Sequence, residues 1–199
     1  MNNLARQPRN DEVVSFDSEE LILVDVDDVE IGHLHKDKCH DGDGLLHRAF
    51  SLFIFNEAGE VLIQQRSAQK RLWPLYWANS CCSHPRHGEE MDDAVRRRLY
   101  QELGIRSELV FLYKFIYHAQ FKDSGAEHEL CWVYIGRSMD PVRANLNEIA
   151  GWKFLSPERL EKELKQCPDS FSPWIRLEWE TMQRDYWKQL SQLLNPGTK

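Results

Sequence analysis

The stretch from Asn79 to Gly104 joins a loop containing cysteine and histidine directly to an amphipathic helix. Acidic residues crowd the start of this helix and arginines its later turns, which is the order of charge that a helix dipole favours. Met91, Val95 and Leu99 recur every fourth residue, so they place one apolar stripe toward a core. Gly104 fits the C′ position that ends a helix. A thiol, an imidazole and a carboxylate can therefore face one pocket.

The segments on both sides of this helix have the apolar patterns of β-strands. Three segments before it predict strands, and the last two form a hairpin expected at the centre of a sheet: residues 21–26, 45–55 and 61–65. Three segments after it also predict strands: residues 108–121, 127–135 and 147–155. Ser156 and Pro157 fit the start of a following helix, and Ser172-Pro173 repeats that signal for a last helix to about Leu194. This order predicts an α+β sandwich.

The composition fits one globular domain of ordinary size. With 199 residues the chain can bury a sizeable core, and its formal charge of −7 argues against a nucleic-acid binder. A few local Lys and Arg side chains could still bind an anionic substrate. Residues 1–19 are polar and lack periodicity, so we expect a mobile arm before a single domain that covers residues 20–199.

The five cysteines are an odd number, and the first residues of the chain lack the apolar core of a secretion signal. Both features predict free thiols in a reducing, cytoplasmic compartment. No apolar run approaches the ~20 residues that span a bilayer, so we expect no membrane association. We expect a monomer or a weak homodimer.

Glu127 and Glu129 are two residues apart in a predicted strand, so both side chains leave the same face of the sheet. Two close carboxylates repel each other, and either protonation of one or a cation between them relieves the repulsion. Taken alone, the pair fits a solvated strand face as well as a cation site.

The loop and helix resemble a degenerate Nudix box, the Gly-x5-Glu-x7-Arg-Glu-x-x-Glu-Glu-x-Gly motif of diphosphate hydrolases. Glu89, Arg97 and Glu102 fit the motif, whereas three positions depart from it: Ser83, Arg98 and Gln101. Hydrolases use the missing carboxylates to gather metal ions around a diphosphate, so their loss disfavours hydrolysis. Together with Asn-Ser-Cys-Cys-Ser-His-Pro at residues 79–85, the box looks like that of type I isopentenyl-diphosphate delta-isomerases. The resemblance extends from about residue 25 to residue 174.

This resemblance implies a Nudix-like α/β/α sandwich with a mixed central sheet and two metal sites. One ion would be held by three histidines and two glutamates: His40, His47, His84, Glu127 and Glu129. Such a mixed set of nitrogen and oxygen ligands fits Mn²⁺ or an expanded Zn²⁺ site. A second ion, Mg²⁺, would be bound by Glu102 and the backbone carbonyl of Cys82 and would bridge to the substrate diphosphate. No flavin is implied. The remaining histidines match no role in the family and are interpreted as surface or hydrogen-bonded core residues: His33, His35, His87, His118 and His128.

The implied reaction converts isopentenyl diphosphate, an isoprenoid diphosphate, to dimethylallyl diphosphate through a tertiary carbocation. The resemblance assigns proton transfer to Cys82 and Glu129, and a thiol suits this role because it is mostly protonated at neutral pH. Trp174 matches an aromatic residue that faces the cation, a contact worth ~2 kcal/mol or more. Tyr117 matches a tyrosine that assists the proton relay or steadies Glu129.

The diphosphate needs basic contacts at the mouth of the pocket. Lys36, Arg66 and Lys70 match these contacts, and Ser83 is a further candidate. Arginine offers a bidentate fork to phosphate, whereas lysine offers a compact charge.

Two other functions are compatible with the sequence. One is a Nudix-type hydrolase that acts on another diphosphate. The other is a metal-stabilised interaction module in which the histidine and glutamate side chains only hold the fold together.

Overall fold

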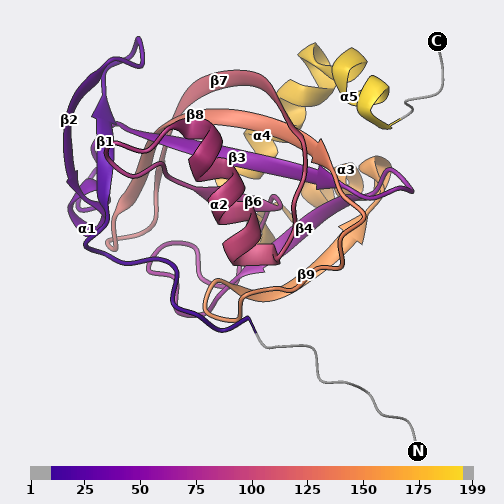
Figure 1. Cartoon of the computed structure of the whole chain (residues 1–199), viewed down its shortest axis with the longest axis horizontal. Coiled ribbons are helices and arrows are strands. Elements are labelled where there is room, and N and C mark those ends of the chain that lie inside the picture. The colour runs from indigo at the N-terminus through magenta and orange to yellow at the C-terminus, as the bar shows by residue number, and fades with distance from the viewer. Residues whose placement is uncertain (1–9, 195–199) are drawn as a thin grey trace, which may run out of the picture.

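Strand β3 (His47–Phe55) lies at the centre of a mixed sheet in the computed structural model, which describes residues 10–194 (Figure 1). Its residues from Ala49 to Phe55 are all buried, so both faces of this strand are covered. On one edge, β3 pairs in parallel with β8 (Ala126–Arg137). The other edge is shared by three antiparallel partners: β1 (Glu20–Val24), β6 (Cys81–Ser83) and β4 (Val61–Arg66).

Four further strands extend the sheet on both sides of β3. They are β2 (Glu30–His35) on β1, β5 (Trp77–Ala78) and β9 (Ile149–Leu155) on β4, and β7 (Leu109–Gln120) on β8. The predicted hairpin of β3 and β4 meets only at Phe55 and Val61. The two strands diverge beyond this pair because β6 occupies the edge of β3 at residues 50–52.

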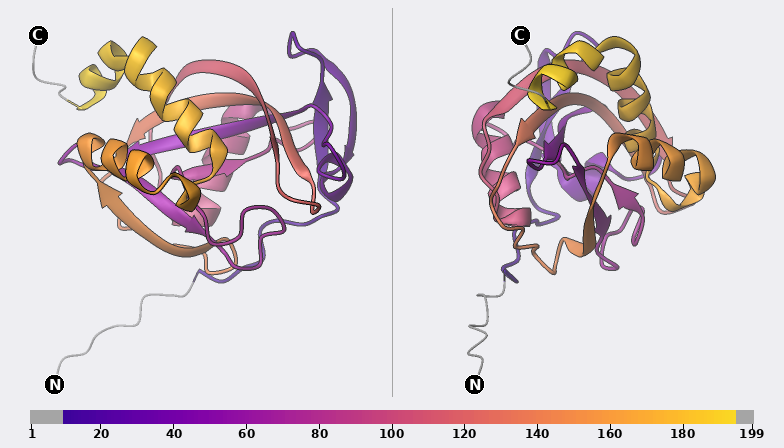
Figure 2. Two further views of the ribbon diagram at one scale, coloured as in Figure 1. Left: turned by 180° about the vertical axis from the view of Figure 1, so that it is seen from behind. Right: turned by 90° about the vertical axis from the view of Figure 1, so that its right-hand side faces the viewer.

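Helices cover both faces of the sheet, as expected for an α/β/α sandwich (Figures 1 and 2). On one face lies α2 (Met91–Leu103), whose Val95 and Leu99 pack against Phe50 and Leu52. On the other face lie α3 (Pro157–Gln166), α4 (Pro173–Asp185) and α5 (Trp187–Leu194). Among the described residues, no helix has the length and apolar character needed to cross a membrane.

The predicted helix ends are confirmed by their backbone geometry. Gly104 has φ +67° and its N–H donates to the Tyr100 carbonyl at 2.8 Å, which ends α2. A side chain at Gly104 would also place its Cβ 2.9 Å from that of Arg143. The Ser156 hydroxyl accepts from the Arg159 N–H at 3.2 Å and caps α3. Local sequence therefore determines where these two helices begin and end.

Two features of the fold differ from the sequence prediction. The last helix is not continuous to Leu194, because it breaks at Tyr186 and gives α4 and α5. Tyr186 stacks on Tyr113 of β7 with ring centroids 4.7 Å apart. Several short elements were also not predicted: β2, β5, β6, α1 (Lys36–Cys39) and the 3₁₀ turn η1 (Pro168–Ser170). Such short segments carry little periodicity of their own.

The predicted mobile arm, residues 1–19, begins outside the described residues, since the structure describes the chain from residue 10 onward. Residues 10–19 contact the body of the domain. The Asn10 amide donates to the carbonyls of Gln101 and Arg143, each at 3.0 Å. The Val14 side chain is 4% exposed, and its carbonyl accepts from Arg98 at 2.6 Å. The mobility of the arm stays a prediction.

We expect the Phe53→Ala substitution to lower the free energy of unfolding by about 3–5 kcal/mol, since it leaves a cavity where β3 packs against Trp179. Urea denaturation measures this loss. Phe111→Ala is the control, because Phe111 is 43% exposed on β7 and its loss should cost about 1 kcal/mol or less. Equal losses in the two variants would contradict a core centred on β3.

Candidate active site

A cavity of about 280 Å³ opens at one end of the sheet. Its walls come from Val13, Ser15 and Asp17, from Arg98 of α2, from residues 147–148, and from α1, the loop after β4, the β6 segment, β7, β8 and the first turn of α4. Most of the candidate residues from the sequence line it: Lys36, His40, Arg66, Lys70, Cys82, Ser83, His84, Tyr117, Glu127, Glu129 and Trp174. The fold therefore brings together side chains that lie up to 138 positions apart, from Lys36 to Trp174. Their roles stay predictions.

One wall of the cavity carries three histidines and two glutamates whose possible ligand atoms all lie within 4.8 Å of one another: His40, His47, His84, Glu127 and Glu129. The pairing of β3 with β8 places His47 opposite Glu129. His40 Nδ1–H donates to the Lys36 carbonyl at 2.6 Å, and His47 Nδ1–H to the Leu45 carbonyl at 2.7 Å. These bonds leave Nε2 of both rings free to bind a metal.

Two buried atoms of this group lack hydrogen-bond partners. They are His47 Nε2 and Glu127 Oε2, although the latter lies 2.8 Å from His40 Nε2. A buried polar atom without a partner is costly, so such atoms call for an explanation. Five ligand atoms that gather around one point, two of them unpaired, fit a bound cation. The donor set therefore suits a metal ion.

Burial and mutual repulsion change the proton affinities in this group. Burial, helped by His40, lowers the pKa of His47 to about 3. Burial and the neighbouring Glu127 raise the pKa of Glu129 well above its usual value. Burial alone would also raise the pKa of Glu127, but His40 outweighs it and lowers that pKa to about 2. Burial opposes protonation of His40, but Glu127 raises the pKa of that ring. Since neutral imidazoles and carboxylates are the forms that bind metals, a cation here would compete with the protons on Glu129 and His40.

Cys82 and Tyr117 face the same cavity from opposite sides of β3. The Cys82 thiol donates to Asn79 Oδ1 at 2.6 Å, and the indole N–H of Trp174 donates to Cys82 Sγ at 3.1 Å. Burial raises the pKa of Cys82 well above its usual value, so its thiol is protonated. The Tyr117 hydroxyl donates to Glu129 Oε2 at 2.7 Å. The cavity thus holds one fixed thiol and one fixed carboxyl group.

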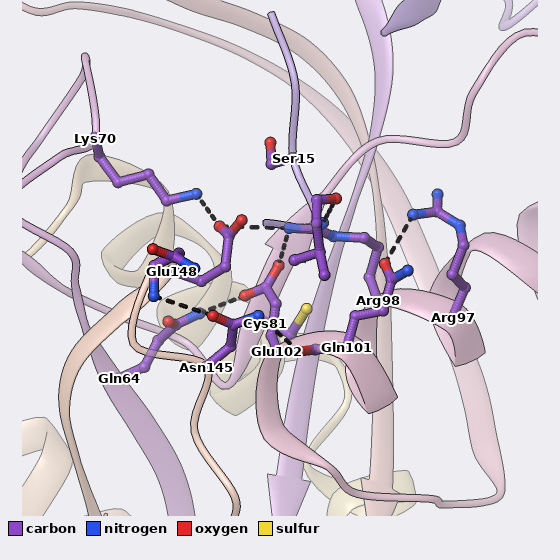
Figure 3. Close-up of polar contacts among 12 residues, drawn as sticks. Ser15, Gln64, Lys70, Cys81, Arg97, Arg98, Gln101, Glu102, Asn145 and Glu148 are labelled. Carbon is purple, nitrogen blue, oxygen red and sulfur yellow. Dashed lines mark hydrogen bonds and ion pairs between the residues drawn. The ribbon is translucent and has the colours of Figure 1, made fainter. Parts of the chain in front are cut away.

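A second charged cluster, around Arg98, borders the cavity (Figure 3). Arg98 Nη2 donates to Glu102 Oε1 at 2.5 Å and lies 3.5 Å from Glu148 Oε2. Lys70 forms an ion pair with the same carboxylate oxygen of Glu148. Burial opposes ionisation of Glu148, but Lys70 and Arg98 lower its pKa to about 2. Each of these carboxylates therefore already has a cationic partner.

The remaining box residues hold the loop before α2. Arg97 makes two hydrogen bonds to Glu89, at 2.6 and 2.7 Å, and one to Gln101 Oε1 at 3.2 Å. The Arg97–Glu89 pair ties the segment that follows His84 to the helix. Gln101 therefore contributes to structure at the position where the hydrolase motif has a carboxylate.

The basic residues at the mouth of the cavity are close enough to repel each other. Burial, together with Lys70 and Arg98, lowers the pKa of Lys36 to about 8. Lys36 Nζ donates to Ser15 Oγ at 2.6 Å. The guanidinium of Arg66 lies 5.2 Å from the centre of the Trp174 ring. An anion bound among these cations would relieve their repulsion.

Sequence reasoning missed three contributors to this site. The sequence identifies Arg98 only as a departure from the box motif. It does not predict that Arg98 is buried and paired with Glu102 and Glu148. Glu148 precedes β9 and no sequence motif contains it. Ser15 belongs to the polar segment expected to be mobile, although it lines the cavity. Only distant contacts place these residues at the site.

Comparisons with known proteins agree with this arrangement. The NUDIX domain family matches residues 45–175. An isopentenyl-diphosphate Delta-isomerase of Photorhabdus laumondii is 41% identical over 174 residues, which cover 86% of this chain and 99% of the relative. The isopentenyl-diphosphate Delta-isomerase of Burkholderia multivorans is 41% identical over a region that covers 79% of this chain and 89% of the relative. The isopentenyl-diphosphate delta-isomerase of Gibberella zeae is 33% identical over a region that covers 91% of this chain and 80% of the relative.

Solved structures resemble the fold. A protein from Deinococcus radiodurans superposes with a TM-score of 0.65 and 25% identity, covering 80% of this chain and 96% of that one. A MutT protein from Methanosarcina mazei superposes with a TM-score of 0.57 and 20% identity, covering 71% and 95%. The second likeness bears on the fold alone.

We expect the wild-type protein to retain about one tightly bound divalent ion after dialysis against Mn²⁺ or Zn²⁺. His47→Gln should lose it, because His47 supplies one of the five converging ligand atoms. Elemental analysis counts the ion, and a metal concentration of 100 times Kd should stabilise the wild-type fold by about 2.7 kcal/mol.

His118→Gln is the control for this substitution. His118 is exposed, and its Nε2 lies 2.7 Å from the Asp43 carbonyl, away from the cluster. Loss of the ion from both variants, or from neither, would argue against a metal site at His47.

We expect Glu148→Gln to be less stable than wild type at pH 7, since it removes the carboxylate that pairs with Lys70 and one of the two carboxylates beside Arg98. The pKa of Glu148 falls from its usual 4.5 to about 2 in the folded state, so its stabilisation is complete above pH 4.5 and is lost as the pH falls toward 2. Urea denaturation across this range should find the two proteins converging. A constant difference at all pH values would contradict this ion pairing.

Proposed function

Since the chain belongs to the type I isopentenyl-diphosphate isomerase family of Nudix-fold proteins, we propose that it converts isopentenyl diphosphate to dimethylallyl diphosphate. One observation carries the proposal: a protonated thiol and a buried carboxyl group face a single cavity whose mouth is basic. The volume of about 280 Å³ is near the lower end for ligand pockets, roughly 300–1,000 Å³, and suits a five-carbon substrate.

In the proposed reaction, one proton is added and one is removed. A proton adds to the terminal methylene carbon, so that a methyl group forms and the adjacent carbon becomes a tertiary cation. Loss of a proton from the carbon next to the C–O carbon then forms the new double bond. Cys82 and Glu129 handle these two protons. Each positioned acid or base typically contributes ~10²–10⁴ in rate.

Two aromatic residues support the reacting groups. Trp174 is 2% exposed, and its indole N–H is fixed by Asn79 Oδ1 at 3.2 Å and by the sulfur of Cys82. Its ring already lies close to one cation, the Arg66 guanidinium, and a desolvated contact of this kind is worth ~2 kcal/mol. Tyr117 holds Glu129 Oε2 and fixes the direction of the carboxyl group.

The histidine and glutamate group would hold one metal ion, for which we propose Mn²⁺ or Zn²⁺ because its ligands are three nitrogens and two oxygens. Such an ion supplies a fixed positive charge beside Glu129. Glu102 would bind Mg²⁺ with the Cys82 carbonyl and the substrate diphosphate. Both carboxylate oxygens of Glu102 have protein partners, Arg98 at 2.5 Å and Gln64 at 3.3 Å, and each keeps a second lone pair for a cation.

The diphosphate would lie among Lys36, Arg66 and Lys70, with Ser83 as a further contact, since all four residues line the cavity. Its charge would compensate the repulsion that lowers the pKa of Lys36. The five cysteines are unpaired, which fits a reducing, cytoplasmic setting. We propose that the enzyme acts as a monomer or a weak homodimer.

Hydrolysis of a diphosphate is the weaker alternative. At two positions where the hydrolase motif has carboxylates that gather metal ions, this chain has the guanidinium of Arg98 and the amide of Gln101. Arg98 also neutralises Glu102, a carboxylate that the box retains. A purely structural role for the metal group leaves the adjoining thiol and the basic mouth of the cavity unexplained.

We expect purified protein, incubated with Mg²⁺ and isopentenyl diphosphate in D₂O, to place deuterium in the methyl group of the product, as followed by proton NMR. Cys82→Ala should lower kcat by about 10²–10⁴ because it removes one of the two proton-handling groups. Cys167→Ala is the matched control, since that thiol is exposed.

Other results would contradict the proposal. An unchanged spectrum with metal-loaded wild-type protein would argue against isomerisation, and phosphate release from nucleoside diphosphates would favour the hydrolase. Glu129→Gln should lose turnover far more than diphosphate affinity. Equal losses in both would remove its role as a proton carrier.

A further inference from the structure

A buried carboxyl group, Glu178, lies behind the reacting residues and has no part in the reaction described above. Glu178 is one helical turn after Trp174 in α4, so both side chains are on the same face of the helix and point toward the sheet. Its exposed fraction is 0%. The helix that fixes Trp174 against Cys82 therefore also carries a carboxyl group into the protein interior.

Glu178 contacts the two strands that position the reacting groups. Its Oε1 lies 3.6 Å from Cys131 Sγ, which in turn lies 3.5 Å from Ser51 Oγ. Cys131 follows Glu129 by two residues and shares its face of β8, while Ser51 of β3 is opposite Cys82 of β6. The chain of contacts from Glu178 thus reaches the strand neighbours of both Cys82 and Glu129.

Glu178 forms no ion pair among residues 10–194, and its Oε2 has no hydrogen-bond partner there. Burial raises its pKa to about 8, although Ser51 and Cys131 oppose this effect. Isolated buried carboxylates are costly, so an unpaired group of this kind is kept neutral. At neutral pH the side chain is mostly a carboxylic acid.

The titratable groups nearest to Glu178 come from three strands: Cys82 of β6, Tyr113 of β7, and Glu129 and Cys131 of β8. A negative charge on Glu178 would lie close to the strands that carry Cys82 and Glu129 and would disfavour negative charge on either group. The neutral form adds no such penalty while it still hydrogen-bonds to the strands. The state of Glu178 is therefore coupled to proton transfer without contact with the substrate.

We propose that Glu178 is a positioning residue for the isomerisation: as an uncharged carboxylic acid it holds α4 against β3 and β8, and its ionisation suppresses turnover. The inference rests on the function proposed above. It assigns a role to a residue that does not line the cavity and that belongs to no motif in the sequence.

Three variants test the proposal. Glu178→Gln keeps the shape and hydrogen bonding of the neutral acid and cannot ionise, whereas Glu178→Leu keeps similar volume and cannot hydrogen-bond. Glu180→Gln is the matched control, because Glu180 is exposed on the same helix. Each is assayed for kcat and KM as fully metal-loaded protein, and thermal unfolding and metal content verify that each is folded and loaded.

At neutral pH we expect Glu178→Gln to keep kcat within about threefold of wild type, and Glu178→Leu to lose about tenfold in kcat with KM nearly unchanged. As the pH rises through about 8, wild-type kcat should fall, whereas that of Glu178→Gln should stay level to higher pH. If Glu178→Gln lowers kcat as much as Glu178→Leu does, the proposal is wrong. It is also wrong if the pH profile of kcat for Glu178→Gln equals that of wild type.

Infrared difference spectra of wild type against Glu178→Gln read the state of this group without any assay of activity. We expect the carbonyl stretching band of a protonated carboxyl group below pH 8, and its loss above pH 8. Absence of the band at neutral pH would overturn the inference. If the band is present but metal-loaded wild type does not isomerise the substrate, the proposed function fails and the neutral state of Glu178 is retained.

Discussion

The parallel pairing of β3 with β8 is the constraint on which the candidate site depends. It places His47 beside Glu129, and the antiparallel pairing on the other edge of β3 places Ser51 beside Cys82. Paired residues of neighbouring strands project from the same face, so the thiol and the carboxyl group share one side of the sheet. A slip of β8 by one residue would turn Glu127 and Glu129 to the opposite face. The buried run of β3 prevents such a slip because it fixes which side chains enter the core.

Two charged clusters border the cavity and are balanced in different ways. The histidine and glutamate group has converging atoms without partners, as expected where a cation from outside the chain completes the charge balance. The cluster of Glu102 and Glu148 contains its own cations, Arg98 and Lys70. The degenerate box therefore replaces part of a metal-gathering surface by an internal guanidinium. This replacement disfavours the activation of water by clustered metal ions.

Several parts of the fold could be predicted because their causes are local. The apolar stripe of α2, Gly104 at its end and the Ser156 cap depend on residues within one or two turns. The long strands were predicted from continuous or alternating apolar residues. The break at Tyr186 was missed because it coincides with the stacking of this ring on Tyr113, a residue 73 positions earlier in the chain. The short β6 strand was missed because its pairing with β3, and not its own three residues, defines it.

The sequence by itself determined the α+β class, the central helix with its ends, and the identity of the side chains that resemble an isomerase site. It also determined that Glu127 and Glu129 project together, since this follows from the two-residue period of a strand. Only the tertiary structure decided that Arg98 pairs with Glu148, that Val13, Ser15 and Asp17 line the cavity, and that Glu178 is buried without an ion pair among residues 10–194. The physical reason is that pairing and burial depend on distances between segments far apart in the chain. Local periodicity carries no information about these distances.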